Sequence, residues 1–227
     1  RYYNAGSSEE FGDVIVAPQT EDHPLRPRSP YGASKCAARH LVKVYRDSYD
    51  LYAVQGWLFN HEGVRRGEEF VTRKITKNVA RILGHYEIGK PVVPLQLGNL
   101  DAKRDWSDAE DFVDGIWKML NQSEPKDYIL SSNETHTIRT FVEEAFNFVG
   151  FHRNECQWKG EGKDEKYFHG SDCFVEINPD FYRPAEVNLL WGDSTKAREE
   201  LGWEPKTNFL QLVKKMVDID VASVITW

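Results

Sequence analysis

A tyrosine and a lysine stand four residues apart in the segment YGASK, at Tyr31 and Lys35. On a helix this spacing places both side chains on one face. There the ammonium group of Lys35 can stabilise the phenolate form of Tyr31. Such a tyrosine can accept a proton from a sugar hydroxyl while the carbon beneath it loses hydride. Many helices carry this pair by chance, so the motif alone favours a structural interpretation.

Hydroxyl and acidic residues cluster upstream, in the segment GSSEEFG at residues 6–12. Ser7 stands five residues before Gly12, and Glu9 stands three residues before it. The adjacent acid Glu10 raises the question of which carboxylate acts. We expect the two side chains to point in opposite directions, because neighbouring residues on a strand edge do so.

Strands alternate with helices along the chain, which predicts an α/β architecture. Ser29 and Pro30 suit the N-cap and the first turn of the helix that bears Tyr31. Polar or charged residues fill the segments 13–30 and 152–180. We expect loop in the first, and loop with weak strands in the second. The expected strands are 1–5, 51–59, 92–97 and 128–130. The expected helices are 31–49, 70–83, 108–120, 138–149, 194–201 and 209–220.

The order of these features resembles the extended short-chain dehydrogenase/reductase superfamily. In that superfamily a hydroxyl residue five positions before a glycine joins the tyrosine and lysine, and Ser7 matches it. Nucleotide-sugar 4,6-dehydratases carry a glutamate three positions before the glycine, and Glu9 matches that position. Epimerases usually have small residues there.

Longer strings resemble GDP-mannose 4,6-dehydratases over nearly the whole chain. They are PRSPYGASK (27–35), LFNHE (58–62), RRGEEFVTRKI (65–75), LGNLDAKRDW (97–106), YRPAEV (182–187) and GDSTKAREELGWEP (192–205). Ser7 stands where this family usually has threonine. Glu10 and Phe11 replace an apolar residue followed by tyrosine.

The resemblance implies an α/β fold: the C-terminal part of a Rossmann-like, doubly wound parallel sheet plus a smaller mixed α/β substrate-binding domain. Residues 1–60 would belong to the NADP-binding Rossmann domain, with its N-terminal half absent. Residues 61–227 would be mainly the domain that binds the GDP-sugar, with some segments returning to the Rossmann domain. No GxxGxxG segment occurs in these 227 residues. We therefore expect the chain alone to bind NADP poorly.

The implied activity is that of an NADP-dependent lyase. It would convert GDP-mannose to GDP-4-dehydro-6-deoxy-mannose by internal hydride transfer and loss of water. The resemblance implies the catalytic residues Ser7, Glu9, Tyr31 and Lys35. It implies contact with NADP for Tyr31, Lys35, His61 and Arg66. It implies contact with GDP-mannose for Asn60, Thr72, Arg73, Lys74, Arg104, Arg183 and Glu186. A homodimer or homotetramer is also implied.

Two other interpretations stay open. An epimerase or reductase of the same superfamily would use the same tyrosine and lysine but would not need Glu9 as a base. A catalytically incomplete fragment would fold without turnover, and would self-associate or pair with a separately encoded N-terminal half.

Composition narrows the class of protein. The net charge of −7 argues against nucleic acid as a partner, because phosphate backbones are bound through a basic excess. The three cysteines show neither a metal-binding spacing nor an even number for pairing, so we expect reduced thiols and no metal site. No apolar run approaches the ~18 residues that a membrane span requires. These features predict a cytoplasmic protein without membrane contact.

Overall fold

The chain forms two compact units in the computed structural model, which describes residues 1–182 and 189–225. Unit 1 takes the described residues of 1–61, 103–136 and 187–208. Unit 2 takes those of 62–102, 137–186 and 209–227. The assignment of NADP binding and sugar-nucleotide binding to separate domains stays a prediction.

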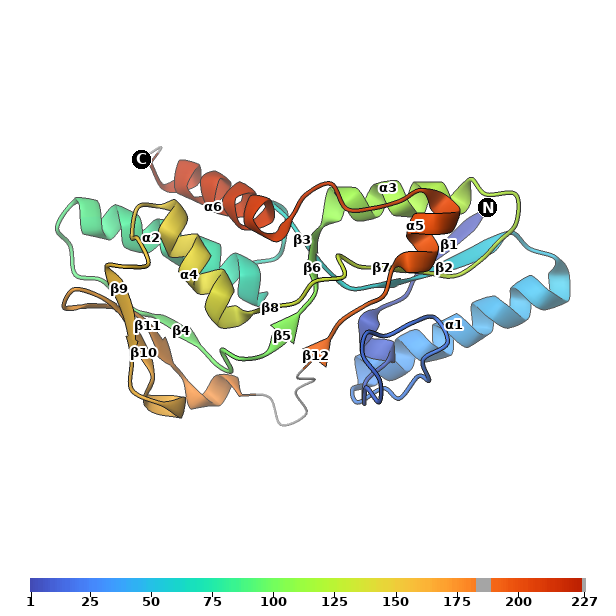
Figure 1. Cartoon of the computed structure of the whole chain (residues 1–227), viewed down its shortest axis with the longest axis horizontal. Coiled ribbons are helices and arrows are strands. Elements are labelled where there is room, and N and C mark those ends of the chain that lie inside the picture. The colour runs from blue at the N-terminus through green and yellow to red at the C-terminus, as the bar shows by residue number, and fades with distance from the viewer. Residues whose placement is uncertain (183–188, 226–227) are drawn as a thin grey trace. The chain divides into compact units, whose positions relative to one another are not determined.

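A parallel sheet forms the centre of unit 1, with the strand order β1-β2-β7. These strands are β1 (Tyr2–Ala5), β2 (Ala53–Leu58) and β7 (Tyr128–Leu130). Tyr2 pairs with Ala53, and Gly56 pairs with Tyr128. Helix α1 (Pro30–Tyr49) crosses from β1 to β2 on one side of the sheet, while α3 (Ala109–Leu120) and α5 (Thr195–Leu201) cover the other (Figure 1). The α/β fold with a parallel sheet is therefore confirmed.

Strand β2 explains why both faces of this sheet are covered, because all six of its residues are buried. Val54 and Leu58 face the cluster that contains Trp203. Trp57 faces a second cluster, with Phe11. A strand whose alternate side chains both need burial suits the centre of a parallel sheet.

Helix α1 begins where the sequence predicts. The hydroxyl of Ser29 accepts a hydrogen bond from the Gly32 amide at 3.0 Å, and Pro30 occupies the first turn. The buried residues of α1 are Gly32, Cys36 and Arg39. A helix that buries an arginine while Leu41 is 60% exposed departs from the usual apolar stripe. A partner for the charge of Arg39 must therefore lie against the inner face of α1.

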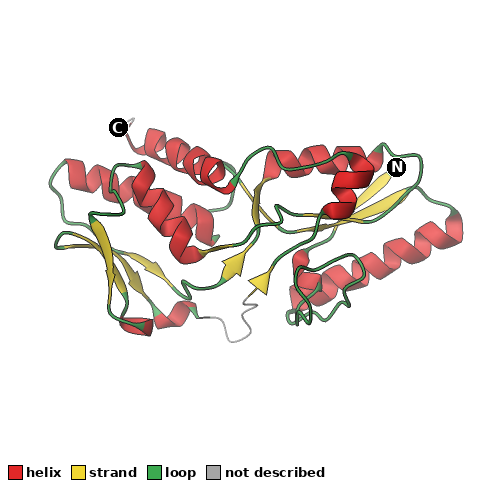
Figure 2. Cartoon of the chain, in the orientation of Figure 1, coloured by secondary structure: helices red, strands yellow, loops and turns green. Residues whose placement is uncertain are grey.

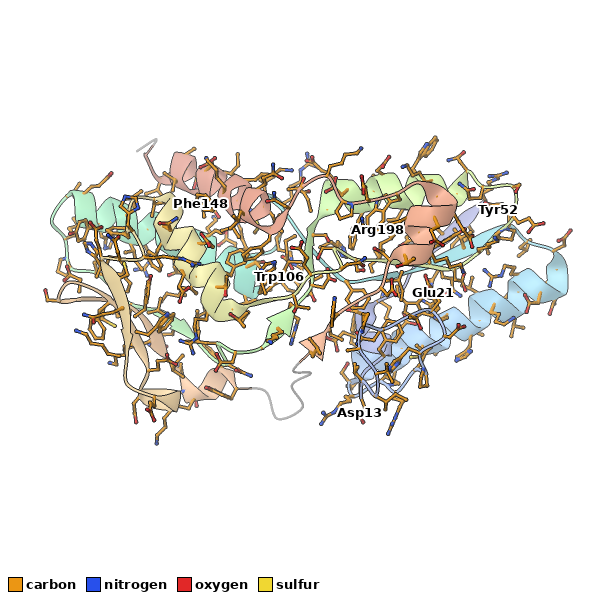
Figure 3. The ribbon with its side chains drawn as sticks, viewed as in Figure 1. Asp13, Glu21, Tyr52, Trp106, Phe148 and Arg198 are labelled. Atoms are coloured by element: carbon orange, nitrogen blue, oxygen red, sulfur yellow. The ribbon has the colours of Figure 1, made fainter. Side chains whose placement is uncertain are left out.

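The long loop between η1 (Ser8–Glu10) and α1 follows the prediction for residues 13–30, since it holds only isolated bridges. Its side chains nevertheless attach it to the sheet. Glu21, labelled in Figure 3, accepts a hydrogen bond from the Ile129 amide of β7 at 2.9 Å. Gln19 accepts one from the Trp191 amide at 3.0 Å.

Unit 2 combines three helices with a four-stranded sheet of order β4-β11-β10-β9 (Figure 1). The helices are α2 (Val71–Glu87), α4 (Ile138–Phe148) and α6 (Phe209–Ile225). The strands are β4 (Leu95–Leu97), β9 (Cys156–Lys159), β10 (Lys166–His169) and β11 (Asp172–Ile177). Strands β9, β10 and β11 are antiparallel, and β11 pairs with β4 in parallel.

The prediction of loop and weak strands for residues 152–180 is confirmed in kind, since three strands alternate with loops there, but it understates how well these strands pack. Charged residues and glycines hide the alternation in this segment, but Tyr167 and Phe174 are fully buried. The ring of Phe174 stacks on Phe146 of α4 with centroids 5.0 Å apart. Aromatic packing from another part of the chain therefore stabilises strands that local propensity does not favour.

The remaining elements are short (Figure 2). They are β3 (Asn60–Glu62), β5 (Lys103–Arg104), β6 (Trp106–Asp108), β8 (His136–Thr137), η2 (Gly162–Asp164), η3 (Pro179–Phe181) and β12 (Leu189–Leu190). All three cysteines are free. Among the described helices, none is long and apolar enough to cross a membrane.

A buried aspartate joins two loops of unit 1. Asp105 is fully buried, and its Oδ1 accepts hydrogen bonds from the amide and the hydroxyl of Ser132, both at 2.7 Å. In the same loop, Asn133 accepts a hydrogen bond from the Ser194 amide at 2.9 Å. Burial raises the pKa of Asp105 to about 7, against the opposing effect of the hydrogen bonds from Ser132 and from the Gly192 and Asn133 amides.

We predict that Asp105 makes the stability of the fold depend on pH. The pKa of this carboxyl rises from its ordinary value of 3.8 to about 7 on folding. Its protonated form therefore favours the folded state, so this contribution is complete below pH 3.8 and is lost as the pH rises through 7. The unfolding free energy of the unsubstituted protein, relative to Asp105→Asn, should fall by up to ~1.4 kcal/mol per pH unit within that window.

Denaturant unfolding at several pH values measures this difference. The exposed Asp172 gives a matched control, Asp172→Asn, whose difference from the unsubstituted protein should not change with pH in this way. The prediction would be contradicted if both variants differed from the unsubstituted protein in unfolding free energy by amounts that change equally with pH.

Candidate active site

The candidate catalytic turn follows the carboxyl end of β1 in unit 1. Ligand sites of open parallel sheets lie at this edge. Ser7 is the N-cap of η1, and its hydroxyl oxygen accepts a hydrogen bond from the Glu9 amide at 3.2 Å. Because the hydroxyl acts there as an acceptor, its proton stays available for donation to a ligand.

The two neighbouring acids of this turn have different surroundings. Glu10 is fully buried; its Oε1 accepts a hydrogen bond from the Ser7 amide at 2.8 Å, and its Oε2 lies 2.5 Å from Nε of Arg39. Glu9 is only half-buried. The prediction that these residues lie on a strand edge is wrong, because they form a short 3-10 helix, which has three residues per turn. The two side chains nevertheless differ in burial, and their divergence stays a prediction.

Helix α1 brings Tyr31 and Lys35 to the same edge of the sheet. Nζ of Lys35 donates a hydrogen bond to the Ala5 carbonyl at 3.0 Å and lies 5.5 Å from the centre of the Tyr31 ring. Tyr31 is 53% exposed, so its phenol can meet a ligand. The lysine thus links the end of β1 to the first turns of α1.

Gly32 allows α1 to touch the catalytic turn. A Cβ at this position would lie 2.6 Å from the Glu9 carbonyl oxygen, which no side chain tolerates without a shift. The close approach places the backbone of Glu9 against the residue that follows Tyr31. Unit 1 therefore brings together Ser7, Glu9, Tyr31 and Lys35, although their catalytic roles stay predictions.

Asn60 and His61 follow β2 in the same unit. Oδ1 of Asn60 is buried and has no hydrogen-bond partner among the described residues. Nδ1 of His61 lies 2.9 Å from the Phe59 carbonyl oxygen, and its ring lies against Phe112 with centroids 5.1 Å apart. Arg104, in β5, is half-buried and donates to the Lys103 carbonyl at 2.9 Å.

In unit 2, a buried carboxylate binds two of the predicted ligand residues. Glu62 is 2% exposed; its Oε2 accepts a hydrogen bond from the Thr72 hydroxyl at 2.6 Å and lies 3.0 Å from Nε of Arg66. Burial raises the pKa of Glu62, while Arg66 and Thr72 oppose the rise. The guanidinium of Arg66 also lies 3.5 Å from the centre of the Phe70 ring.

Two further candidates on α2 also have partners inside unit 2. Arg73 pairs with Asp220 of α6 at 2.8 Å and donates to the Val64 carbonyl. Nζ of Lys74 lies 3.8 Å from the centre of the Phe181 ring, and burial lowers the pKa of this lysine. The predictions for Arg183 and Glu186 lie outside the described residues.

Arg39 is a residue of this site that sequence reasoning missed. It follows Lys35 by four positions and Tyr31 by eight, so all three share one face of α1. The available signal was this spacing together with the unusual acid at Glu10. A charge on the inner face of a helix needs an opposite charge nearby.

We predict that Gly32→Ala disturbs the contact between α1 and the catalytic turn. The added methyl group would force Glu9 and Tyr31 apart, with an expected loss of ~1–3 kcal/mol of unfolding free energy. This loss should occur although alanine favours helices over glycine by ~1 kcal/mol. Thermal or denaturant unfolding measures it.

Gly63→Ala is the control for this substitution, since no heavy atom lies within 4 Å of a Cβ at Gly63. Its unfolding free energy should match that of the unsubstituted protein. The interpretation of the close approach would be wrong if both alanine variants were equally stable.

Solved structures with similar folds include a dTDP-glucose 4,6-dehydratase and UDP-glucose 4-epimerases. RMD from Pseudomonas aeruginosa complexed with NADPH superposes with a TM-score of 0.77 at 18% identity, covering 97% of this chain and 66% of that one. The dTDP-glucose 4,6-dehydratase of Bacillus anthracis in complex with NAD gives 0.76 at 21% identity, covering 99% and 63%. These likenesses show a Rossmann-type fold shared with dehydratases and epimerases.

Sequence comparisons are more specific. GDP-mannose 4,6 dehydratase of Drosophila melanogaster is 46% identical over 97% of this chain and 54% of its own length. The human protein of that name is 44% identical, with 97% and 58% covered, and that of Sinorhizobium fredii 45%, with 98% and 62%. The chain thus spans little more than half the length of these relatives. The family model described as GDP-mannose 4,6 dehydratase matches residues 1–216, so the chain belongs to this family.

Proposed function

We propose that the protein is a GDP-mannose 4,6-dehydratase, an NADP-dependent hydro-lyase that converts GDP-mannose to GDP-4-dehydro-6-deoxy-mannose and water. The observation that carries this proposal is the position of Glu9. It is the half-buried acid of a turn that also presents Ser7, and its backbone carbonyl lies against Gly32, the residue that follows Tyr31 on α1. A dehydratase needs such a base in addition to the tyrosine and lysine, whereas an epimerase does not.

The donors and acceptors of unit 1 fit a nicotinamide cofactor and a sugar nucleotide. The ammonium of Lys35 has three donors and uses one for the Ala5 carbonyl, so it can also bind ribose hydroxyls. The buried Oδ1 of Asn60, without a hydrogen-bond partner in the described ranges, suits a donor on the sugar nucleotide. His61 and Arg66 are the further residues proposed to contact NADP.

The first step is oxidation at C4 of the mannose ring. Tyr31, as phenolate, accepts the proton of the C4 hydroxyl, and the ammonium of Lys35 stabilises that phenolate. Ser7 donates a hydrogen bond to the C4 oxygen. NADP supplies the redox chemistry when bound, since no side chain can accept hydride from C4 and return it to C6.

The second step is loss of water across C5 and C6. The C4 ketone makes the C5 proton acidic. Glu9 removes this proton and passes it to the C6 hydroxyl, which leaves as water. The hydride would return from bound NADP to C6, and C5 would regain a proton from Tyr31, which took one from the C4 hydroxyl. Tyr31 would then again be ionised, and the reaction would have no net redox change. Glu10 is unsuited to this role because its carboxylate is already paired with Arg39 and the Ser7 amide.

The proposal extends to the rest of the ligand and to assembly. Thr72, Arg73, Lys74, Arg104, Arg183 and Glu186 are proposed to bind the nucleotide. For Thr72 and Arg73 this requires exchange of partners, because their side chains are bound to Glu62 and Asp220. A homodimer or homotetramer in the cytoplasm is the proposed working form.

Incubation of the full-length gene product with GDP-mannose and NADP tests the activity directly. We expect a 4-keto, 6-deoxy sugar nucleotide, identified by mass spectrometry and by the reactivity of its ketone. A C4 epimer of the substrate would instead support the epimerase interpretation, and unchanged GDP-mannose would refute the dehydratase assignment.

Two substitutions should separate the chemical steps. Tyr31→Phe removes the proton acceptor, so hydride transfer and all later steps should stop. Glu9→Gln should permit oxidation at C4 but block elimination, so that reduced cofactor accumulates and can be followed by its absorbance. The proposed division of labour fails if both variants behave alike.

A further inference from the structure

An ion pair is buried directly beneath the catalytic turn. The side chain of Arg39 is 6% exposed and that of Glu10 is 0% exposed, with 2.5 Å between Nε and Oε2. The guanidinium of Arg39 also lies 3.4 Å from the centre of the Trp57 ring in β2. Such a pair is costly to bury, so a fold that keeps one needs its geometry to be well satisfied.

The carboxylate of Glu10 connects two elements of the site. One oxygen accepts from the Ser7 amide at 2.8 Å, and the other meets Arg39 of α1. Ser7 and Glu9 belong to the turn, whereas Arg39 lies one helical turn from Lys35 and two from Tyr31. One side chain therefore joins the half of the site on η1 to the half on α1.

The arginine is itself attached to the sheet. Its carbonyl oxygen accepts a hydrogen bond from Nε2 of Gln55 in β2 at 2.9 Å. Asp127, just before β7, lies 3.8 Å from its Nη1 and also pairs with Arg46 at 2.8 Å. This chain of alternating charges gives the guanidinium a fixed place relative to the strands.

The space below the turn is also closely filled. A Cβ at Gly6 would lie 2.5 Å from Nη2 of Arg39 and 2.7 Å from Oε1 of Glu10. The end of β1 thus rests on the ion pair. A change in the shape of the pair must move the backbone that carries Ser7.

We propose that Arg39 is a positioning residue of the dehydratase reaction: through Glu10 it holds the turn of Ser7 and Glu9 against α1. Glu9, and not Glu10, then faces C5 of the sugar. This proposal rests on the proposed function. Loss of the clamp displaces Ser7 and Glu9 but leaves Tyr31 and Lys35 on α1. Elimination, which needs Glu9 as its base, then slows more than oxidation at C4, to which Ser7 contributes one hydrogen bond.

Arg39→Lys in the full-length gene product tests the proposal. The lysine keeps the charge but loses the planar guanidinium, whose Nε meets Glu10 and whose face lies on the Trp57 ring. Nη1 and Nη2 of Arg39 have no hydrogen-bond partner among the described residues. We expect kcat to fall about 10–100-fold, as misplacement of a reacting group does. KM for GDP-mannose should stay within about twofold, because the residues proposed to bind the nucleotide lie outside the turn. Reduced cofactor should accumulate, which a general loss of folded protein would not cause.

Arg46→Lys is the matched control. Arg46 lies on the same helix and pairs with the same Asp127. It is in the last turn of α1, where it donates to the Ala53 carbonyl, and it contacts neither Glu10 nor the turn. Its kcat should stay within about twofold of the unsubstituted enzyme. Equal loss of kcat in both variants, or no accumulation of reduced cofactor in Arg39→Lys, would overturn the proposal.

Hydrogen exchange gives a readout that does not depend on the substrate. In Arg39→Lys the Ser7 amide should exchange at least about tenfold faster, because its acceptor is displaced, while amides of β2 keep their rates. Glu10→Gln is the second variant, for use if Arg39→Lys fails to fold. It retains only one of the two contacts of Glu10 and should also show faster exchange at Ser7. Unchanged exchange at Ser7 would refute the clamp. If the Ser7 amide of Arg39→Lys exchanged faster while the unsubstituted protein left GDP-mannose unchanged, the clamp would be supported and the proposed function refuted.

Discussion

The buried pair of Glu10 and Arg39 is the interaction on which the arrangement of unit 1 depends. A carboxylate without solvent exposure needs hydrogen-bond donors and an opposite charge, and this one has the Ser7 amide and a guanidinium. Removal of one partner from such a pair costs ~3–5 kcal/mol, because the other charge stays buried and uncompensated. Turn η1, helix α1 and strand β2 must therefore occupy fixed relative positions, and the candidate catalytic residues lie on the first two.

The same constraint distinguishes two acids that are adjacent in sequence. Glu10 is held inside by its two contacts, and the 3-10 turn directs Glu9 to the partly exposed side. Glycines allow the necessary close approaches, at Gly32 toward the Glu9 carbonyl and at Gly6 above the ion pair. The hydrogen bond from Lys35 to the Ala5 carbonyl fixes the end of β1 against α1. Chemistry of the proposed kind needs such prior placement of base and acid, since correct orientation supplies much of a catalytic rate.

Local signals in the sequence predicted much of this arrangement. The cap at Ser29 and the proline after it define the start of α1, and the apolar run before Asn60 defines a buried strand. The spacing of Tyr31 and Lys35 identifies one helix face. Each of these signals is contained within a few residues, where backbone geometry determines the outcome.

The features that could not be predicted depend on residues far apart in the chain. The strands within residues 152–180 are well packed because Phe174 meets Phe146 of α4, a contact that no local pattern encodes. The partner of Glu10 lies 29 residues away, on a helix whose apolar side chains do not mark its inner face. Likewise, the ion pair of Arg73 with Asp220 joins α2 to α6. The two residues are far apart in the chain, so the sequence around Arg73 gave no sign of that contact.

A crystal structure of the full-length protein with NADP and GDP-mannose tests the central claim most directly. The assignment of the two acids predicts a Glu9 carboxylate oxygen about 3–3.5 Å from C5 of the mannose ring, with Glu10 still paired to Arg39. A structure in which Glu10 has left Arg39 and faces the sugar, with Glu9 directed to solvent, would contradict it.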